Sequence, residues 1–464
     1  MNYNHTLIII ICYNNYKYLN NMVKQLENLI VEPNILIINN NSNCKYTIDY
    51  LNKLNNKYNI INCDKNFGHL VWMEPFIFNR LPDRFIITDA DLELNKNTPK
   101  NFLDIMVEIS EQYKSNKVGF ALDISEPEKM FKYNFYDFGY NNIPTICESQ
   151  KQYWVNRVID NKLEMYFSPI DTTFCLFNKN HNGSHIRIAG DFTMKHLPWY
   201  IDIDGISKLS RYLMYKDSSS SSSVKCFEIQ YFKDNNYIPI IKRNETFLIQ
   251  MNGGINDYFW KEIYPTWENE TFDIFDKYLN KEKQFLDIGA WVGVTCLYAS
   301  RLSSYVVCVE ADPVSVKNLQ HNINTNLLET NIDIEDSAIY NETTNVLFGP
   351  NNFSSTSQLN DSMSQIKFTK TNDFDVFKKT ITLDEIIKKY NLNNLSLIKV
   401  DIEGGEEYIL NDLLEYSNTN NVPLYISFHY DWWVNKNLDR FLYLQNHHKN
   451  QIISSPFCSI LFTP

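Results

Sequence analysis

The sequence lacks the features that would place it in a membrane or in an oxidising compartment. No apolar run among its 464 residues approaches the roughly 20 residues that a membrane-spanning helix needs. The apolar run near the start, LIIIIC, is short, and the residues before it carry no basic flank of the kind that secretory signals have. The nine cysteines show neither a CxxC pair nor a Cys/His metal spacing. We therefore expect a cytoplasmic protein with reduced thiols and no membrane span.

Basic residues are too few for a nucleic-acid-binding surface. The chain contains 43 Lys and Arg residues against 55 Asp and Glu residues, which gives a net charge of −12. A general phosphate-backbone binder needs a basic footprint, so we expect no nucleic-acid partner. The negative charge does not exclude nucleotides, because backbone donors and a metal ion can hold them. The oligomeric state is not predicted by the sequence.

What is present predicts two α/β domains. A chain of this length exceeds one typical core. The one low-complexity segment, KDSSSSSSVK (216–225), indicates a linker or loop. Before it, short apolar runs alternate with helical stretches, which predicts a parallel sheet with right-handed crossovers. After it, we expect a β-rich stretch from CFEIQYF to TFLIQM (226–251) and then a second alternation. The predicted domains are 1–215 and 225–464, joined by a serine-rich linker at 216–224.

An acidic pair follows the strand that we predict within FIITDADLEL (85–94). Asp89 and Asp91 are spaced by one residue, and Glu93 follows. The spacing alone admits two interpretations. A buried strand can run out into a solvated acidic turn, which is the commoner case, or it can deliver carboxylates to a metal ion. Glu93 is interpreted as a surface residue.

A second motif, FLDIGAWVGVTCLYAS (285–300), has the order strand, small-residue turn, helix. Asp287 ends the predicted strand, and Gly289 and Gly293 allow a ligand to approach the backbone closely at a helix N-terminus. Trp291 stands where a GxGxxG motif has its second glycine. The next strand, in SYVVCVEADP, ends at Glu310, where a carboxylate can accept both hydroxyls of a ribose. This order predicts an adenosine-binding site.

DIGAWVG, VEADP, DSAI and IKVDIEGGEE together resemble the FkbM family of S-adenosylmethionine-dependent methyltransferases, over about residues 225–464. The resemblance implies a class I Rossmann-like methyltransferase fold and O-methylation of a sugar or a similar hydroxyl. It implies that S-adenosylmethionine contacts six residues: Asp287, Gly289 and Gly293 at the methionine end, Glu310 at the ribose, Asp336 near the adenine and Glu268 at the entrance. Methyl transfer to oxygen needs an aligned hydroxyl and a group that takes its proton. The candidates are Asp401, Glu403 and His429, and a packed core histidine is the alternative for His429.

CYNN, NILIINNNS and NCDKNFGHLVW resemble the opening of family 2 glycosyltransferases with the GT-A fold, over about residues 4–204. The resemblance implies that a nucleotide-sugar donor contacts Tyr13, Asn14, Asn39, Asn66, Gly68 and Asp89. Asn39 stands where an aspartate is usual. The family's DxD motif falls on FIITDADLEL, which implies a divalent metal, Mn²⁺ or Mg²⁺, held by Asp89, Asp91 and His196. The implied general base is Asp171, with Asp191 as the second choice.

The expected fold is therefore α/β, with two tandem Rossmann-like domains: a GT-A glycosyltransferase fold and then a class I S-adenosylmethionine methyltransferase fold. The expected function is transfer of a sugar from a nucleotide-sugar donor to a glycan acceptor, combined with methylation of a sugar hydroxyl. A first alternative, favoured by Asn39, keeps the methyltransferase and makes the first domain an inactive glycan-binding module. A second alternative is a structural protein with two inactive domains, which leaves the polar groups at successive strand ends unexplained.

Overall fold

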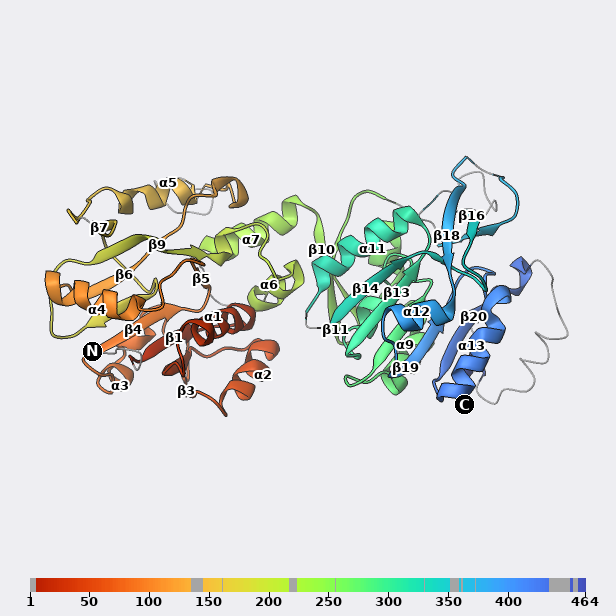
Figure 1. The fold of residues 1–464 in the computed structure, drawn as a ribbon, viewed down its shortest axis with the longest axis horizontal. Coiled ribbons are helices and arrows are strands. Elements are labelled where there is room, and N and C mark those ends of the chain that lie inside the picture. The colour runs from red at the N-terminus through yellow and green to blue at the C-terminus, as the bar shows by residue number, and fades with distance from the viewer. Residues whose placement is uncertain are drawn as a thin grey trace. The chain divides into compact units, whose positions relative to one another are not determined.

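A computed structural model describes most of the chain: residues 6–134, 145–160, 162–216, 223–254, 256–328, 330–350, 359, 362–371, 373–433, 451–453 and 458–464. The chain forms two compact units (Figure 1). The first contains Met1–Ile206 and Ser210–Tyr231, and the second contains Ser207–Leu209 and Phe232–Pro464. No helix among the described residues is long and apolar enough to cross a membrane.

Four parallel strands form one half of the sheet in the first unit. They lie in the order β3 (Asn59–Asn62), β2 (Ile35–Asn39), β1 (Ile8–Cys12) and β4 (Arg84–Asp89). All five residues of β1, IIIIC, are buried, as expected of a strand that is covered on both faces. The helices α1 (Tyr16–Leu29) and α2 (Lys45–Leu54) alternate with these strands. Because the strands are parallel and in register, their polar carboxyl ends meet at one edge of the sheet.

The four strands that were predicted to be parallel are parallel. The other half of this sheet, which was not predicted, is mixed. β8 (Cys175–Asn178) pairs antiparallel with both β4 and β6 (Lys117–Leu122), and β9 (Ile186–His196) pairs parallel with β6. β9 also pairs antiparallel with β5 (Leu92–Leu94) and with β7 (Met165–Phe167). The predicted run FIITDADLEL is thus two strands, β4 and β5. Asp89 ends β4, and Asp91 lies in the turn between the strands. The remaining helices of this unit are α3 (Pro75–Phe78), α4 (Phe102–Tyr113), α5 (Ile146–Lys151), α6 (Lys208–Tyr215) and α7 (Ser223–Asp234).

The prediction of a strand at CFEIQYF was wrong, because these residues lie in the helix α7. Their apolar residues alternate with polar ones, which resembles a strand pattern. In the helix, however, Phe227 and Tyr231 lie four residues apart on one face, and both rings contact Phe131 of the first unit. Ile229 lies between them and is exposed. By its contacts, α7 up to Tyr231 belongs to the first unit, and the division at 216–224 stays a proposal.

A buried ion pair attaches α7 to α6. Arg211 and Glu228 are each 2% exposed and form an ion pair. Arg211 also donates hydrogen bonds to the carbonyl oxygens of Tyr200 and Ile201, at 2.9 and 2.8 Å. We expect Glu228→Ala to lower the free energy of unfolding of the first unit by about 3–5 kcal/mol, because it leaves a buried guanidinium without its anion. Denaturant unfolding measures this loss of stability. The double variant Arg211→Met/Glu228→Leu removes both charges and should recover most of the lost stability. If it recovers none, the unpaired buried charge is not the cause of the loss.

The second unit contains a seven-stranded sheet. The order is β14 (Asn331–Asp336), β13 (Tyr305–Glu310), β12 (Gln284–Ile288), β19 (Leu395–Val400), β20 (Leu424–Phe428), β22 (Cys458–Phe462) and β21 (Gln451–Ile453). The first five strands are parallel, and β22 pairs antiparallel with both of its neighbours. The order reverses at β12, where successive connections leave toward opposite sides. Ligands of open α/β sheets bind in the crevice at such a point, beyond the carboxyl ends of the strands.

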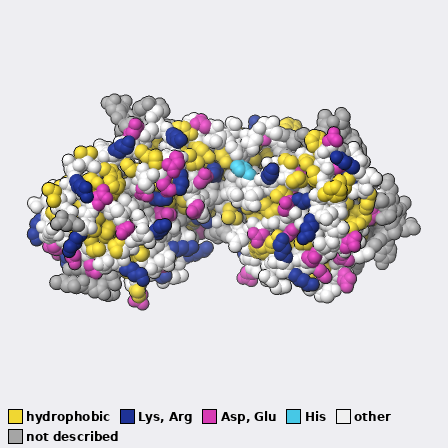
Figure 2. Space-filling view, turned by 45° about the horizontal axis from the view of Figure 1, so that its top comes forward, with side chains coloured by type: hydrophobic (Ala, Val, Ile, Leu, Met, Phe, Trp, Pro, Cys, Tyr) yellow, Lys and Arg dark blue, Asp and Glu magenta, His cyan; other side chains and the backbone are white. Residues whose placement is uncertain are grey.

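Several smaller elements complete the second unit. Its helices are α8 (Asn256–Tyr258), α9 (Asn269–Tyr278), α10 (Cys296–Ala299), α11 (Pro313–Asn326), α12 (Leu383–Lys389) and α13 (Glu406–Asn420). A hairpin of β10 (Tyr237–Lys242) and β11 (Glu245–Gln250) fulfils the later part of the predicted β-rich stretch. A four-stranded sheet that was not predicted has the order β15 (Ala338–Ile339), β18 (Val376–Ile381), β16 (Asn345–Pro350) and β17 (Ser364–Lys367). On the face in Figure 2, basic and acidic side chains are interspersed.

Candidate functional sites

The acidic pair and the predicted ligand histidine meet at one edge of the first sheet. Asp91 lies in the turn between β4 and β5, and His196 ends β9, which pairs with β5 in the register Leu92↔His196. The Nε2 atom of His196 is 3.5 Å from the Oδ2 atom of Asp91. The other Asp91 oxygen, Oδ1, and the Nδ1 atom of His196 are buried and accept or donate no hydrogen bond within the described chain. These atoms are available to a ligand.

Asp89 lies slightly apart from that pair. Its Oδ2 atom accepts a hydrogen bond from the hydroxyl of Thr172. Burial raises the pKa of Asp89 well above its ordinary value, and the negative charges of Asp91 and Asp171 raise it further. Among the described residues, the ligand atoms of Asp89, Asp91 and His196 do not all lie within 4.8 Å of one another, the spacing at which three side chains could hold one metal ion. The structure therefore brings two of the three predicted metal ligands together, and the complete set stays a prediction.

The two candidate bases differ in their surroundings. Asp171 lies close enough to affect the pKa of Asp89. Burial raises the pKa of Asp171, but a 2.9 Å hydrogen bond from the Thr173 hydroxyl and the charge of Arg187 outweigh it and hold the pKa below its ordinary value. Asp171 and Asp191 are both exposed. Asp191 lies on β9, and its carbonyl accepts a hydrogen bond from Thr98. The geometry therefore favours Asp171 over Asp191 as the residue that acts beside the acidic pair.

Asparagines connect the loops that follow β1 and β2. The side chain of Asn14, which has a φ of 55°, accepts hydrogen bonds from the backbone N–H groups of Asn43 and Cys44, at 2.8 and 2.9 Å. Its own N–H donates to the hydroxyl of Ser42 at 3.0 Å. Asn14 therefore holds the two loops together, and its contact with the donor stays a prediction. Tyr13, beside it, is half-buried.

Asn39 and the next loop are also held by amide side chains. Asn39 accepts a hydrogen bond from Ser42 N–H at 2.9 Å and donates to Asn62 at 2.9 Å. Asn66 and Gly68, the latter with a φ of 76°, are held by Asn40, whose amide donates to the Asn66 side chain and to the Gly68 carbonyl. This role of Asn40, which is 2% exposed, was not predicted, because no local pattern marks it.

A cavity of about 250 Å³ opens at the reversal point of the second sheet. Its lining residues come from the ends of β12, β13 and β19, from the loop after β20 and from the small four-stranded sheet. Six of the predicted site residues line it: Glu268, Gly289, Glu310, Asp401, Glu403 and His429. Asp287, Gly293 and Asp336 do not.

The glycine turn after β12 is shaped by backbone contact. Gly289, Trp291 and Gly293 all have positive φ values, 85°, 48° and 99°. A Cβ atom added to Gly289 would lie 1.8 Å from the carbonyl oxygen of Asp401, so only glycine fits there. Trp291 adopts the left-handed conformation although it is not glycine, and its N–H donates to Glu310 at 2.7 Å. Thus the departure from GxGxxG preserves the turn.

Glu310 is fixed by three backbone donors. Its Oε2 atom accepts the Trp291 N–H, and its Oε1 atom accepts the N–H groups of Ala311 and Asp312, both at 2.8 Å. Burial raises the pKa of Glu310 to about 7, although the hydrogen bonds from these N–H groups oppose the shift. The carboxylate lies at the carboxyl end of β13 and lines the cavity, as expected of a residue that accepts ribose hydroxyls.

A buried lysine connects Asp287 to the opposite side of the cavity. The Nζ atom of Lys399 is 3.5 Å from Asp287 Oδ1 and 3.6 Å from Asp401 Oδ2, and it donates to the Gly289 carbonyl at 3.2 Å. Asp287 also accepts a 2.6 Å hydrogen bond from the Thr295 hydroxyl. Asp287 therefore acts on the cavity through Lys399 and the turn, a partner that the sequence analysis missed.

The remaining two predicted cofactor residues are placed differently. Glu268 immediately precedes α9 and lines the cavity, where burial and the charge of Asp401 raise its pKa to about 7. Asp336 is exposed at the end of β14 and forms an ion pair with Lys378. Its neighbour Ser337 lines the cavity instead, one residue further along the chain. A contact of the adenine with this segment would therefore involve Ser337 more directly than Asp336.

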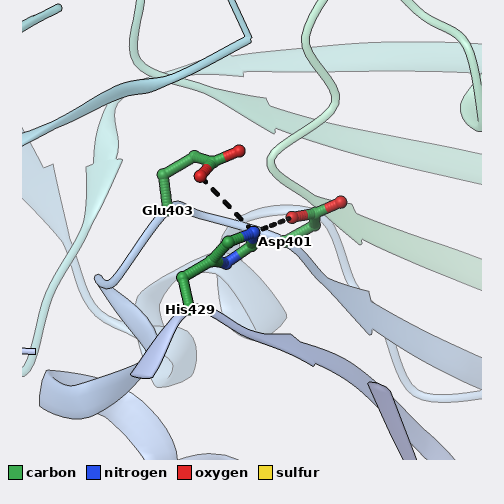
Figure 3. Close-up of side chains that lie close together, drawn as sticks. All are labelled: Asp401, Glu403 and His429. Carbon is green, nitrogen blue, oxygen red and sulfur yellow. Dashed lines mark ion pairs between the residues drawn. The ribbon is translucent and has the colours of Figure 1, made fainter. Parts of the chain in front are cut away.

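Asp401, Glu403 and His429 point toward one another at the edge of the cavity (Figure 3). The Nε2 atom of His429 is 3.6 Å from Asp401 Oδ1 and 3.4 Å from Glu403 Oε2. Its Nδ1 atom forms a 3.0 Å hydrogen bond with the fully buried Glu406. Glu406 belongs to the motif IKVDIEGGEE but was not singled out, because its partner lies 23 residues away.

The charges around His429 shift the titration of the cluster. Burial lowers the pKa of His429, but the hydrogen bond with Glu406 and the surrounding carboxylates outweigh it and raise the pKa to about 9. Burial also raises the pKa of Glu403 to about 9. At neutral pH the cluster therefore retains protons that isolated side chains would have released. The alternative of an ordinary core histidine does not account for three facing carboxylates.

Two family models match the chain. The model described as "Glycosyl transferase family 2" matches residues 7–151, and the one described as "Methyltransferase FkbM domain" matches residues 287–449. No curated protein matches. Both predicted resemblances and the predicted fold class, a GT-A glycosyltransferase fold followed by a class I methyltransferase fold, are confirmed.

Solved structures show only distant likeness to this chain. The methyltransferase FkbM from Methylobacillus flagellatus KT is 11% identical, with 99% of this chain and 90% of that chain covered and a TM-score of 0.26. A tRNA (uracil-54, C5)-methyltransferase from Pyrococcus abyssi, in complex with S-adenosyl-L-homocysteine, is 14% identical, with 22% and 24% covered and a TM-score of 0.17. Precorrin 8W decarboxylase from Methanobacterium thermoautotrophicum is 11% identical, with 43% and 91% covered and a TM-score of 0.26. At these TM-scores the likeness carries no argument.

Proposed function

Because the chain joins a glycosyl transferase family 2 region to an FkbM methyltransferase domain, we propose that it is a bifunctional glycan-modifying enzyme. In this proposal, the first unit transfers a sugar from a nucleotide-sugar donor in a metal-dependent reaction. The second unit uses S-adenosylmethionine to methylate a sugar hydroxyl. The observation that carries the proposal is the cavity of the second unit, which brings Glu310 and the Asp401–Glu403–His429 cluster to one space of about 250 Å³.

In the first unit, the acidic edge would bind the donor diphosphate. Asp89, Asp91 and His196 would hold a divalent cation, which supplies neutralisation of the charge that develops on the departing diphosphate. The unpartnered Oδ1 atom of Asp91 and the 3.5 Å approach of His196 support this assignment. Asp171 would take the proton of the acceptor hydroxyl, since its lowered pKa keeps it ionised at neutral pH.

In the second unit, Glu310 would orient the ribose, and the Gly289 turn would receive the methionine end of S-adenosylmethionine. The sulfonium is already a strong electrophile, so the protein needs to align the hydroxyl and accept its proton. Without a further ligand, His429 holds a proton at neutral pH because its pKa is raised to about 9. The proton acceptor would then be a carboxylate, and Asp401, with 20% of its side chain exposed, is the more accessible one.

We expect binding of S-adenosylmethionine to strengthen about tenfold between pH 6 and pH 8. Hydroxyl groups of the ribose donate to an ionised carboxylate, and the pKa of Glu310 is raised to about 7. A group with that pKa is about one-tenth ionised one unit below it. The same shift makes the ligand-free unit less stable as the pH rises from the ordinary value of 4.5 to about 7, because burial disfavours the ionised form.

Calorimetric titration at several pH values measures this effect. The matched variant Glu310→Gln should bind more weakly and lose most of the pH dependence. If Glu310→Gln shows the same tenfold rise as the wild type, Glu310 is not the titrating group and its assignment to the ribose fails.

The second candidate function keeps the methyltransferase and makes the first unit an inactive glycan-binding module. The observation that favours it is Asn39, an amide at a position where the family usually has an aspartate. Calorimetry with a nucleoside diphosphate in the presence and absence of Mn²⁺ separates the two. Metal-dependent binding supports the bifunctional enzyme, and its absence, with S-adenosylmethionine still bound, supports the binding module.

A further inference from the structure

The carboxylates of Asp401 and Glu403 lie near the Nε2 atom of His429 but too far from it for charge-assisted hydrogen bonds. They are still close enough for the three charges to affect one another. The two carboxylate oxygens lie 3.6 and 3.4 Å from the His429 Nε2 atom, whereas charge-assisted N–H···O bonds are about 2.7–2.9 Å long. The Oε2 atom of Glu403 is buried and has no hydrogen-bond partner within the described chain. All three ligand atoms lie within 4.8 Å of one another. The gap between them is of the size that an ion fills.

The surroundings hold this arrangement in place. Glu406 fixes the imidazole through Nδ1, so that Nε2 faces the two carboxylates. Glu406 itself accepts hydrogen bonds from the N–H groups of Ile402 and Gly404 and from the Trp433 indole, each at 3.3 Å. The Trp432 ring stacks on the imidazole with an interplanar angle of 11°. A buried carboxylate on the far nitrogen of a histidine is the usual support of a histidine that binds a metal.

We propose that Asp401, Glu403 and His429 form a divalent-cation site in the methyltransferase unit, separate from the acidic edge of the first unit. With bonds of about 2.1 Å, ligand atoms around a tetrahedral ion lie roughly 3.4 Å apart, which agrees with the separations of 3.4 and 3.6 Å. One imidazole nitrogen and two carboxylate oxygens suit Mn²⁺, Fe²⁺, Co²⁺ or Zn²⁺ better than Ca²⁺. Three protein ligands leave at least one position for an oxygen of another molecule.

The role of the site rests on the proposed methyl transfer. All three residues line the cavity, so the open position faces the space where the acceptor hydroxyl would lie. Binding of that hydroxyl to the cation lowers its pKa and fixes its oxygen for attack. With the cation bound, Asp401 is a ligand instead of the proton acceptor, and the hydroxyl proton leaves to solvent. The bond between sulfur and the methyl carbon breaks, and a bond between oxygen and that carbon forms. S-adenosylhomocysteine and the methyl ether are the products.

Mn²⁺ binding tests the site without any methyltransferase assay. The background is the full chain carrying Asp89→Asn and Asp91→Asn, which lacks both carboxylates among the three predicted metal ligands of the first unit. On this background we expect one Mn²⁺ per chain by electron paramagnetic resonance titration. Adding Asp401→Asn or Glu403→Gln should weaken Mn²⁺ binding at least tenfold, and adding the control Glu415→Gln, an exposed carboxylate on α13, should not. Unchanged Mn²⁺ affinity in both site variants would overturn the proposal.

A second measurement avoids mutating the site. Zn²⁺ added to the background protein should shift the NMR resonance of His429 Nε2, and no shift at saturating Zn²⁺ would overturn the proposal. Glu406→Gln tests the positioning role of Glu406, with an expected loss in metal affinity of about 10–100-fold.

A thermal shift with S-adenosylmethionine in every variant shows that the unit is folded. If S-adenosylmethionine binds and no metal does, the cation site fails while the proposed function stands; if S-adenosylmethionine does not bind the wild type, the proposed function itself fails.

Discussion

Asp91→Asn should reduce sugar transfer by about a thousandfold or more and leave S-adenosylmethionine binding unchanged. Neutralisation of a leaving diphosphate by a bound cation contributes several kcal/mol to the transition state, and each 1.4 kcal/mol corresponds to about a factor of ten in rate. Asp91 is the carboxylate that approaches His196 and has an unpartnered buried oxygen. Its loss therefore removes the ligand that the other two residues cannot replace. Turnover of a panel of nucleotide sugars with Mn²⁺ measures the effect.

The same substitution should not destabilise the first unit. The charge of Asp91 is one of the causes that raise the pKa of Asp89, which means that the two carboxylates repel each other. Removing one charge relieves this repulsion, so we expect the melting temperature to stay the same or to rise. Loss of activity with retained stability is the pattern of a functional residue.

Glu93→Gln is the matched control for Asp91→Asn. It makes the same chemical change two residues further on, where Glu93 pairs across the strands with Lys195. We expect it to leave sugar transfer within about twofold of the wild type. Equal losses in the two variants would show that the negative charge of this edge matters in general, and would contradict a specific metal-binding role of Asp91.

Local patterns predicted the parts of the fold whose determinants lie close together in the sequence. The wholly buried run of β1 and the order strand, turn, helix around Gly289 were both readable, because apolar periodicity and a small-residue turn suffice to specify them. The helix α7 was not, because its residues alternate like a strand and only the contact with Phe131 shows which face is buried. The mixed half of the first sheet also depends on pairings between distant segments, such as β4 with β8.

The candidate sites divide in the same way. Glu310 ends β13, and Asp401 and Glu403 lie within three residues after β19, so their position at the edge of the sheet could be inferred from the sequence. The residues that hold them could not. Glu406 meets its histidine across 23 residues, and Lys399 meets Asp287 only because β19 lies beside β12. Asp336 is a residue for which the sequence predicted the segment but not the side chain. Asp336 is exposed, and the next residue, Ser337, lines the cavity.

Gly289→Ala should abolish S-adenosylmethionine binding and lower the stability of the second unit on the order of 4 kcal/mol. The added Cβ atom would lie 1.8 Å from the Asp401 carbonyl oxygen, which is backbone and cannot rotate away. The φ of 85° adds strain for any residue with a side chain. The Asp401 N–H donates to the Ile288 carbonyl at 2.9 Å, so the ends of β12 and β19 must separate to make room. The cofactor turn and the cluster beyond it would then be displaced together.

Two other glycines calibrate this result. Gly254→Ala also adds one methyl group, but no atom lies within 4 Å of the new Cβ. This variant should therefore bind S-adenosylmethionine like the wild type. Gly293→Ala should be intermediate, because its φ of 99° is strained but the nearest atom, at 3.1 Å, is the end of the flexible Leu319 side chain. Calorimetry measures the affinity for S-adenosylmethionine, and the melting transition that S-adenosylmethionine shifts measures the stability of the second unit. Binding by Gly289→Ala as strong as by Gly254→Ala would show that the turn does not hold the cofactor, and the methionine end would have to be placed elsewhere in the cavity.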